Sequence, residues 1–131
     1  MWFVDASVVV AILGREEDWR EMADLLELYP RRLWSPVSHW ECVPALVKRL
    51  RRSESSVRAL LTDFIQDNAF ELVAIGEREA AVALDAHAQY GKGSGHPAQL
   101  NMGDCFAYAC ARTNGARLLY KGDDFAKTDL A

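Results

Sequence analysis

The feature that most constrains this chain is the alternation of short apolar runs with longer segments of helical pattern along its 131 residues. Short runs of this kind are typical of buried strands, and a strand followed repeatedly by a helix is typical of a parallel sheet. We predict strands at residues 2–4, 32–35, 70–75 and 117–120. The sequence therefore predicts an α/β fold, a central and mainly parallel sheet flanked by helices.

The intervening segments carry helical signals, with apolar residues at steps of three and four and Gly or Pro at several ends. We predict helices over 6–13, 16–28, 55–68, 77–90 and 102–113, and one that starts at Pro36 and ends in basic residues 48–52. In that helix Trp40, Val43, Val47 and Leu50 form one apolar stripe. We expect Trp40, like the other three tryptophans, to lie in the core.

The length and the net charge of the chain restrict the class of protein to which it can belong. A chain of this size folds as one domain of about 100–150 residues, so we treat 1–131 as a single domain. Half of the residues are apolar, which argues against disorder. The net charge of −4 argues against a general nucleic-acid coat protein. It does not exclude a nuclease, because a metal ion held by carboxylates reverses the local charge.

Cysteine usage and hydropathy predict the compartment. The three cysteines form no CxxC pair, and their odd number points to a reducing compartment. His39 and Cys42 have no second ligand pair at zinc-site spacing, so we expect no zinc. The apolar N-terminal run contains Asp5 and lacks a basic region, unlike a signal peptide, and no run approaches a membrane span. We expect a cytoplasmic protein with no membrane segment.

Acidic residues mark the predicted carboxyl ends of strands, where sites form in parallel sheets. Asp5 follows the first strand, and Asp123 and Asp124 follow the last. Glu41 lies on a mostly apolar helix face, and Asp104 opens a helix that is almost entirely apolar. An unpaired carboxylate in such surroundings is costly.

Helix capping explains Asp5 and Asp104 equally well when each is taken alone. Capping does not explain Glu41, nor the recurrence of acidic residues at four distant positions. Carboxylates brought together would repel one another without a cation. A site with oxygen ligands and no His or Cys suits Mg²⁺ or Mn²⁺ rather than zinc or copper.

Four segments together are similar to a known family: VDASVVVAIL, SHWECV, NMGDCFAYACA and LLYKGDDF. They resemble the PIN-domain ribonucleases of the VapC toxin type over nearly the whole chain, including the YGKG loop and the trailing TDLA. The resemblance implies a PIN fold and Mg²⁺- or Mn²⁺-dependent cleavage of RNA as the toxin of a type II toxin–antitoxin system. It also implies a cognate VapB antitoxin and a homodimer.

The resemblance also assigns the site. Asp5, Glu41 and Asp104 match the acidic triad of the family. Some members carry their fourth Asp where this chain has Gly122, so that carboxylate comes from Asp124 or Asp123, and we favour Asp124 beside Phe125. We expect Asp5 and Asp104 to ligate the metal directly. Glu41 and Asp124 would ligate it, act through water, or orient the attacking water.

Basic residues near these segments are candidates for phosphate contacts, although a solvated helix end explains most of them as well. They are Lys48, Arg49, Arg51, Arg52, Arg58, Lys92 and Lys121.

Two other functions share part of this pattern. A phospho-receiver domain shares the size, the sheet and a late Lys, but it needs paired acids after its first strand and an Asp after a central strand. Here Asp5 stands alone and the strand to Ile75 runs into Gly76. An RNA-processing PIN nuclease that is not a toxin would use the same chemistry as a toxin.

Overall fold

The structure is a computed structural model that describes all 131 residues. Its elements are β1 (Trp2–Val4), α1 (Ala6–Leu13), α2 (Trp19–Leu26), β2 (Arg32–Trp34), α3 (Pro36–Leu50), α4 (Glu54–Asp67), β3 (Phe70–Leu72), α5 (Glu77–Tyr90), α6 (Met102–Thr113) and β4 (Arg117–Leu119). The predicted bounds of α1, α5 and α6 are confirmed. The predicted helix 16–28 is shorter because residues 14–18 form a turn, in which Arg15 has a positive φ of 52°.

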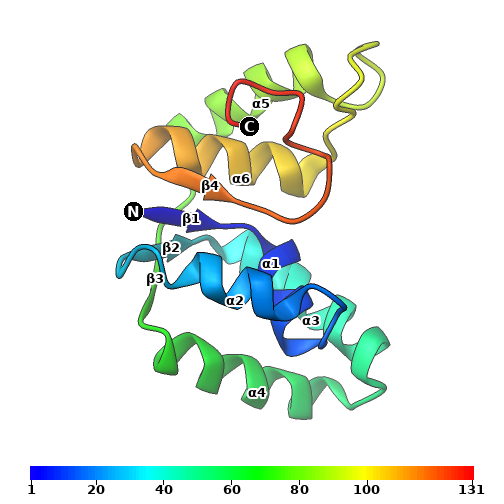
Figure 1. The fold of residues 1–131 in the computed structure, drawn as a ribbon. Helices are drawn as coiled ribbons and strands as arrows, with labels where there is room; N and C mark the ends of the chain where they lie inside the picture. Colours follow the sequence, from blue (N-terminus) through cyan, green and yellow to red (C-terminus); the bar gives the residue numbers. More distant parts are fainter.

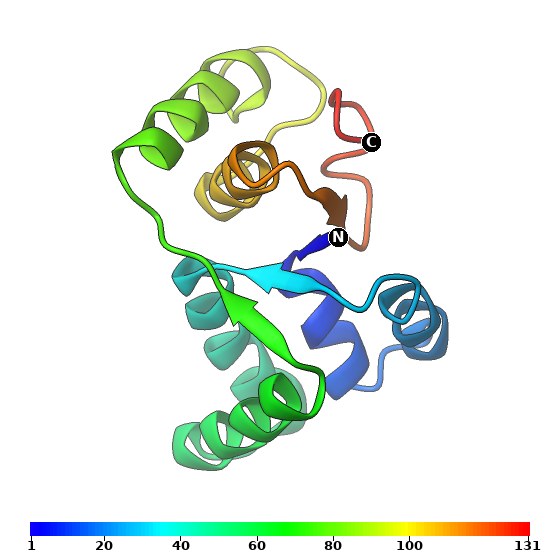
Figure 2. The same cartoon turned by 90° about the vertical axis from the view of Figure 1, so that its left-hand side faces the viewer.

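The four strands form one parallel sheet in the order β3-β2-β1-β4 (Figures 1 and 2). Helices α1 to α4 cover one face, and α5 and α6 cover the other. The connections after β1 and β2 add strands on one side of β1, whereas β4 pairs on its other side. The direction of winding therefore reverses at β1, and ligand sites form at such a point, beyond the carboxyl ends of the strands.

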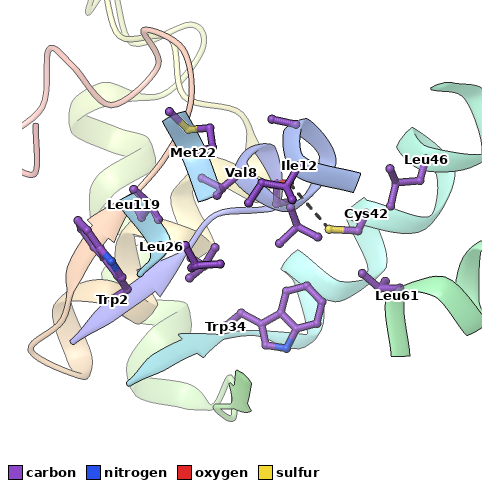
Figure 3. Close-up of a cluster of buried hydrophobic side chains, with 14 of the residues drawn as sticks. Trp2, Val8, Ile12, Met22, Leu26, Trp34, Cys42, Leu46, Leu61 and Leu119 are labelled. Carbon is purple, nitrogen blue, oxygen red and sulfur yellow. Dashed lines mark hydrogen bonds between the residues drawn. The ribbon is translucent and has the colours of Figure 1, made fainter. Parts of the chain in front are cut away.

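Two apolar cores hold these layers together. Successive side chains of β1 point to opposite faces, so Trp2 and Val4 enter the core beneath α1 to α4, and Phe3 enters the core beneath α5 and α6. In the first core the Cys42 thiol contacts the Ala6 carbonyl oxygen at 3.9 Å (Figure 3). This contact fixes α3 against the start of α1, next to Asp5.

The expectation that all four tryptophans lie in the core is wrong for Trp40. Trp2 and Trp34 are buried, Trp19 is half-buried, and Trp40 is 71% exposed. Helix α3 packs inward through Ser38, Cys42 and Leu46 instead. Trp40, Val43 and Val47 of the predicted stripe line a surface groove beside α4. Val43, Val47 and Leu50 also pack against the first core.

All three cysteines are free and buried. None of the helices combines the length and the hydropathy needed to span a bilayer.

Candidate active site at the carboxyl edge of the sheet

The fold brings the predicted carboxylates to one edge from four separate elements. Asp5 follows β1, and Asp124 lies in the loop after β4. These strands are parallel neighbours with Val4 opposite Leu119, so both residues emerge at the same edge. Glu41 lies in the second turn of α3, which starts after β2, and Asp104 lies in the first turn of α6.

Asp5 is buried and hydrogen-bonded. Its Oδ2 accepts a hydrogen bond from the Ser7 backbone N–H at 3.1 Å and another from the Ser7 hydroxyl at 2.5 Å. The Ser7 Oγ accepts from the Lys121 backbone N–H at 3.0 Å. Burial raises the pKa of Asp5, and the Ser7 hydrogen bonds oppose that rise. Ser7 therefore joins Asp5 to the loop that carries Asp124, and no sequence pattern indicates this link.

Asp104 takes part in a reciprocal cap. Its backbone N–H donates to Asn101 Oδ1 at 2.9 Å, and its Oδ2 accepts from the Asn101 N–H at 3.1 Å. The predicted capping role is thus present at Asp104, and Asp5 likewise caps α1. Burial nevertheless raises the pKa of Asp104 to about 7, with added repulsion from Asp124 and Asp5. The Asp104 side chain therefore both caps α6 and belongs to the acidic cluster.

Glu41 and Asp124 complete the cluster. Burial, with a further contribution from the charge of Asp5, raises the pKa of Glu41 to about 7. The charge of Asp124 raises the pKa of both Asp5 and Asp104. The choice of Asp124 rather than Asp123 as the fourth acidic residue stays a prediction. Phe125 is buried and anchors this loop in the second core.

The chemistry of these donors suits a hard divalent cation. The cluster offers carboxylate oxygens only, and burial together with a neighbouring like charge disfavours the charged forms of Asp5, Glu41 and Asp104. No group of three or more His, Cys, Asp or Glu lies close enough together to surround a metal ion as it stands. Burial raises the pKa of the neighbouring Cys105 thiol to about 11, which makes it a poor ligand.

Lys121 does not neutralise the cluster. Its ammonium group pairs with Glu16 and, at 3.1 Å, with Asp18 in the turn between α1 and α2. This pairing argues against its expected role as a phosphate contact. Of the other basic candidates, Arg49 donates to the Gly14 carbonyl and Arg52 donates to Ser56.

Sequence reasoning missed the residue that anchors the C-terminal segment. Asp129 accepts hydrogen bonds from the Tyr108 hydroxyl at 2.7 Å and the Tyr90 hydroxyl at 3.3 Å. It also pairs with Arg112 at 2.5 Å. These contacts fasten the segment after Asp124 to α5 and α6. The partners lie 17 to 39 residues away, so no local pattern indicates them.

Residues 2–130 match the PIN domain. The chain therefore belongs to the PIN domain family, which confirms the family and the fold expected from the sequence.

Its curated relatives within that family are VapC ribonucleases. It is 45% identical to VapC ribonuclease R02377 of Rhizobium meliloti, over 99% of each chain. It is 38% identical to ribonuclease VapC42 of Mycobacterium tuberculosis, over 97% of this chain and 95% of that one.

Solved structures share the fold at lower identity. The M. tuberculosis toxin VapC20, which cleaves the sarcin–ricin loop, superposes with a TM-score of 0.76 at 15% identity, covering 96% of this chain and 93% of that one. A chain of a toxin–antitoxin complex from Klebsiella pneumoniae superposes with a TM-score of 0.71 at 18% sequence identity. The match covers 99% of this chain and 94% of that one.

Proposed function

We propose that this chain is a divalent-metal-dependent endoribonuclease and the toxin of a type II toxin–antitoxin pair. The observation that carries the proposal is the convergence of four carboxylates at the winding reversal of the sheet, in a chain whose relatives are VapC ribonucleases. An RNA-processing role would use the same site. The names of the relatives favour the toxin.

Asp5 and Asp104 would hold Mg²⁺ or Mn²⁺, because both are fixed by hydrogen bonds that leave oxygen lone pairs free. The bound ion would lower the pKa of a water and offset negative charge on the scissile phosphate. Ser7 and Asn101 hold the two carboxylates in place. Glu41, with a pKa of about 7, is suited to take a proton from the attacking water near neutral pH. Asp124 would supply the fourth carboxylate of the cluster.

The groove beside α3 is the surface that we propose for the antitoxin. It has a volume of about 720 Å³ and apolar walls that include Trp40, Val43 and Leu72. Lys48 and Arg58 stand among its lining residues. An amphipathic helix with acidic flanking residues would cover these apolar side chains and pair with the two cations. We expect Trp40→Ala to weaken capture of the antitoxin while RNA cleavage is retained.

A second copy of this chain is the partner that we propose for the groove between α5 and α6. Leu84 and Met102, at 70% and 67% exposure, flank this groove of about 400 Å³. It contains little charge, which suits a self-complementary contact about a twofold axis. Sedimentation should show a dimer that Leu84→Asp converts to a monomer.

The nuclease proposal is tested with purified protein and a panel of structured RNAs in Mg²⁺, in Mn²⁺ or in excess chelator. Cleavage should require either ion and stop with chelator. Cleavage that persists in chelator would contradict the metal assignment, and intact RNA throughout would contradict the activity.

The toxin role is tested separately in cells. Induced expression should arrest growth, and co-expression of a short reading frame adjacent to this gene should restore it. Normal growth on induction of a protein that cleaves RNA in vitro would favour the processing role.

A further inference from the structure

Gly103, the second residue of α6, has no backbone reason to be glycine. Glycine is needed where φ is positive, and Gly103 is not among the glycines of this chain with a positive φ. It also lies in a helix, where glycine is less favourable than alanine. Some other feature of its surroundings must explain the absence of a side chain.

That feature is the Glu41 carboxylate. A Cβ atom built on Gly103 would lie 2.6 Å from Glu41 Cδ and 2.7 Å from Oε1, and it would overlap Oε2. All three of the nearest atoms to that Cβ belong to this one carboxylate. The head of Glu41 therefore rests on the backbone of α6 in the space that any side chain at position 103 would fill.

This contact joins the helix that carries Glu41 to the helix that carries Asp104. Glu41 is carried by α3, and Gly103 directly precedes Asp104 on α6. A carboxylate resting on Gly103 is consequently held at the start of α6, where the charge of Asp5 also acts on it. Since Glu41 is a flexible side chain, a methyl group at position 103 would push this carboxylate away rather than move α6.

We infer that Gly103 is a positioning residue for the nuclease reaction, because its missing side chain lets the Glu41 carboxylate reach the acidic cluster. This inference rests on the proposed function. It separates Gly103 from residues that serve the fold, since removing the glycine should damage the site and spare the helix.

The first test compares Gly103→Ala with a matched control, Gly76→Ala. A Cβ on Gly76 would lie an ordinary 3.6 Å from Glu79 Oε1, also at a helix N-terminus. In chelator, Gly103→Ala should melt at or above the wild-type temperature, because alanine favours the helix. Its Mn²⁺ affinity, followed by the paramagnetic resonance of free Mn²⁺, should fall about tenfold. Its kcat should fall more than its KM rises, and Gly76→Ala should bind Mn²⁺ like wild type.

The second test asks whether Gly103 acts through Glu41. In a Glu41→Ala background, Gly103→Ala should leave Mn²⁺ affinity almost unchanged, because the displaced group is gone. Adding Glu41→Asp to Gly103→Ala should recover part of the lost affinity, since the shorter side chain clears the methyl group. If Gly103→Ala instead disrupts folding, Glu41→Asp will recover nothing, and the inference fails.

Wild-type Mn²⁺ affinity in Gly103→Ala, or an equal loss with and without Glu41, would also overturn it. The Mn²⁺ measurements need no RNA, so a wild-type protein that cleaves no RNA would contradict the proposed function and leave this test standing.

Discussion

At the N-terminus of α6, Asp104 accepts the Asn101 N–H through one carboxylate oxygen and shares a cluster with Asp5 and Asp124. Asp104→Asn separates the two roles, because the asparagine side-chain oxygen can still accept the Asn101 N–H but carries no charge. We expect the metal-free variant to melt at or above the wild-type temperature, since one source of repulsion is gone. RNA cleavage should fall about 100-fold or more. Thermal melts and cleavage rates with and without Mg²⁺ provide the measurement.

The outcome that would contradict the metal role is a variant with wild-type cleavage and an unchanged rise in melting temperature on adding Mg²⁺. A variant that is inactive because it is unfolded would be recognised by its melt in chelator.

The two consecutive acids after β4 differ in surroundings. The charge of Asp124 helps to raise the pKa values of the buried Asp5 and Asp104 carboxyls. Asp124→Asn should therefore impair RNA cleavage and Mn²⁺ binding about tenfold more than Asp123→Asn. Parallel cleavage assays and Mn²⁺ titrations of the two variants measure this difference. Equal losses, or a larger loss for Asp123→Asn, would show that the fourth carboxylate is misassigned.

At the scale of elements, a single side chain, Asp129, attaches the segment after β4 to the rest of the fold. Asp129 holds it to α5 and α6 through Tyr90, Tyr108 and Arg112. Asp129→Ala should release this segment and with it Asp124, so Mn²⁺ affinity should fall about tenfold although residue 129 is not in the cluster. Hydrogen exchange should increase over residues 121–130 and stay unchanged in α1. Asp63→Ala, at an exposed position on α4, is the control and should alter neither measurement.

Some elements could be predicted from sequence because their signals are local. Helices α1, α5 and α6 have clear ends, and strand ends indicated where Asp5 and Asp124 would meet. Trp40 was predicted wrongly, because it shares its helical periodicity with Val43, Val47 and Leu50, which do pack against the first core.

The roles of Arg32 and Asp129 could not be predicted, because their partners come from distant segments. Arg32 is buried and donates to the carbonyls of Leu26, Tyr29 and Asn68, at the ends of α2 and α4. Side-chain contacts of this kind depend on the final packing of the chain.

For the whole molecule, the buried acids make stability depend on pH. Glu41 and Asp104 have pKa values of about 7, against ordinary values of 4.5 and 3.8. Between about pH 4 and 7 the folded protein retains protons that the unfolded chain has released, so lowering the pH stabilises the fold. The metal-free protein should therefore melt at a higher temperature at pH 5 than at pH 8. Melts in chelator across this range test the expectation.

Added Mn²⁺ should raise the melting temperature more at pH 8 than at pH 5, because it replaces the bound protons. Replacing both acids, as Glu41→Gln with Asp104→Asn, should flatten the pH dependence of the metal-free protein. A melting temperature in chelator that rises steadily from pH 5 to pH 8 would contradict this account.

The pairing of β4 with β1 has a consequence for the order in which activity arises during synthesis. Asp5 is translated first of the four acids and Asp124 last, and Asp124 reaches the others only after β4 has joined the sheet beside β1. That pairing spans most of the chain, so it is a late contact for a nascent polypeptide to make. A ribosome that stalls before residue 117 would release a product with Asp5, Glu41 and Asp104 but no fourth carboxylate. We expect such fragments to be harmless to the cell, because under the proposed mechanism the acidic cluster is complete only when the last strand is in place.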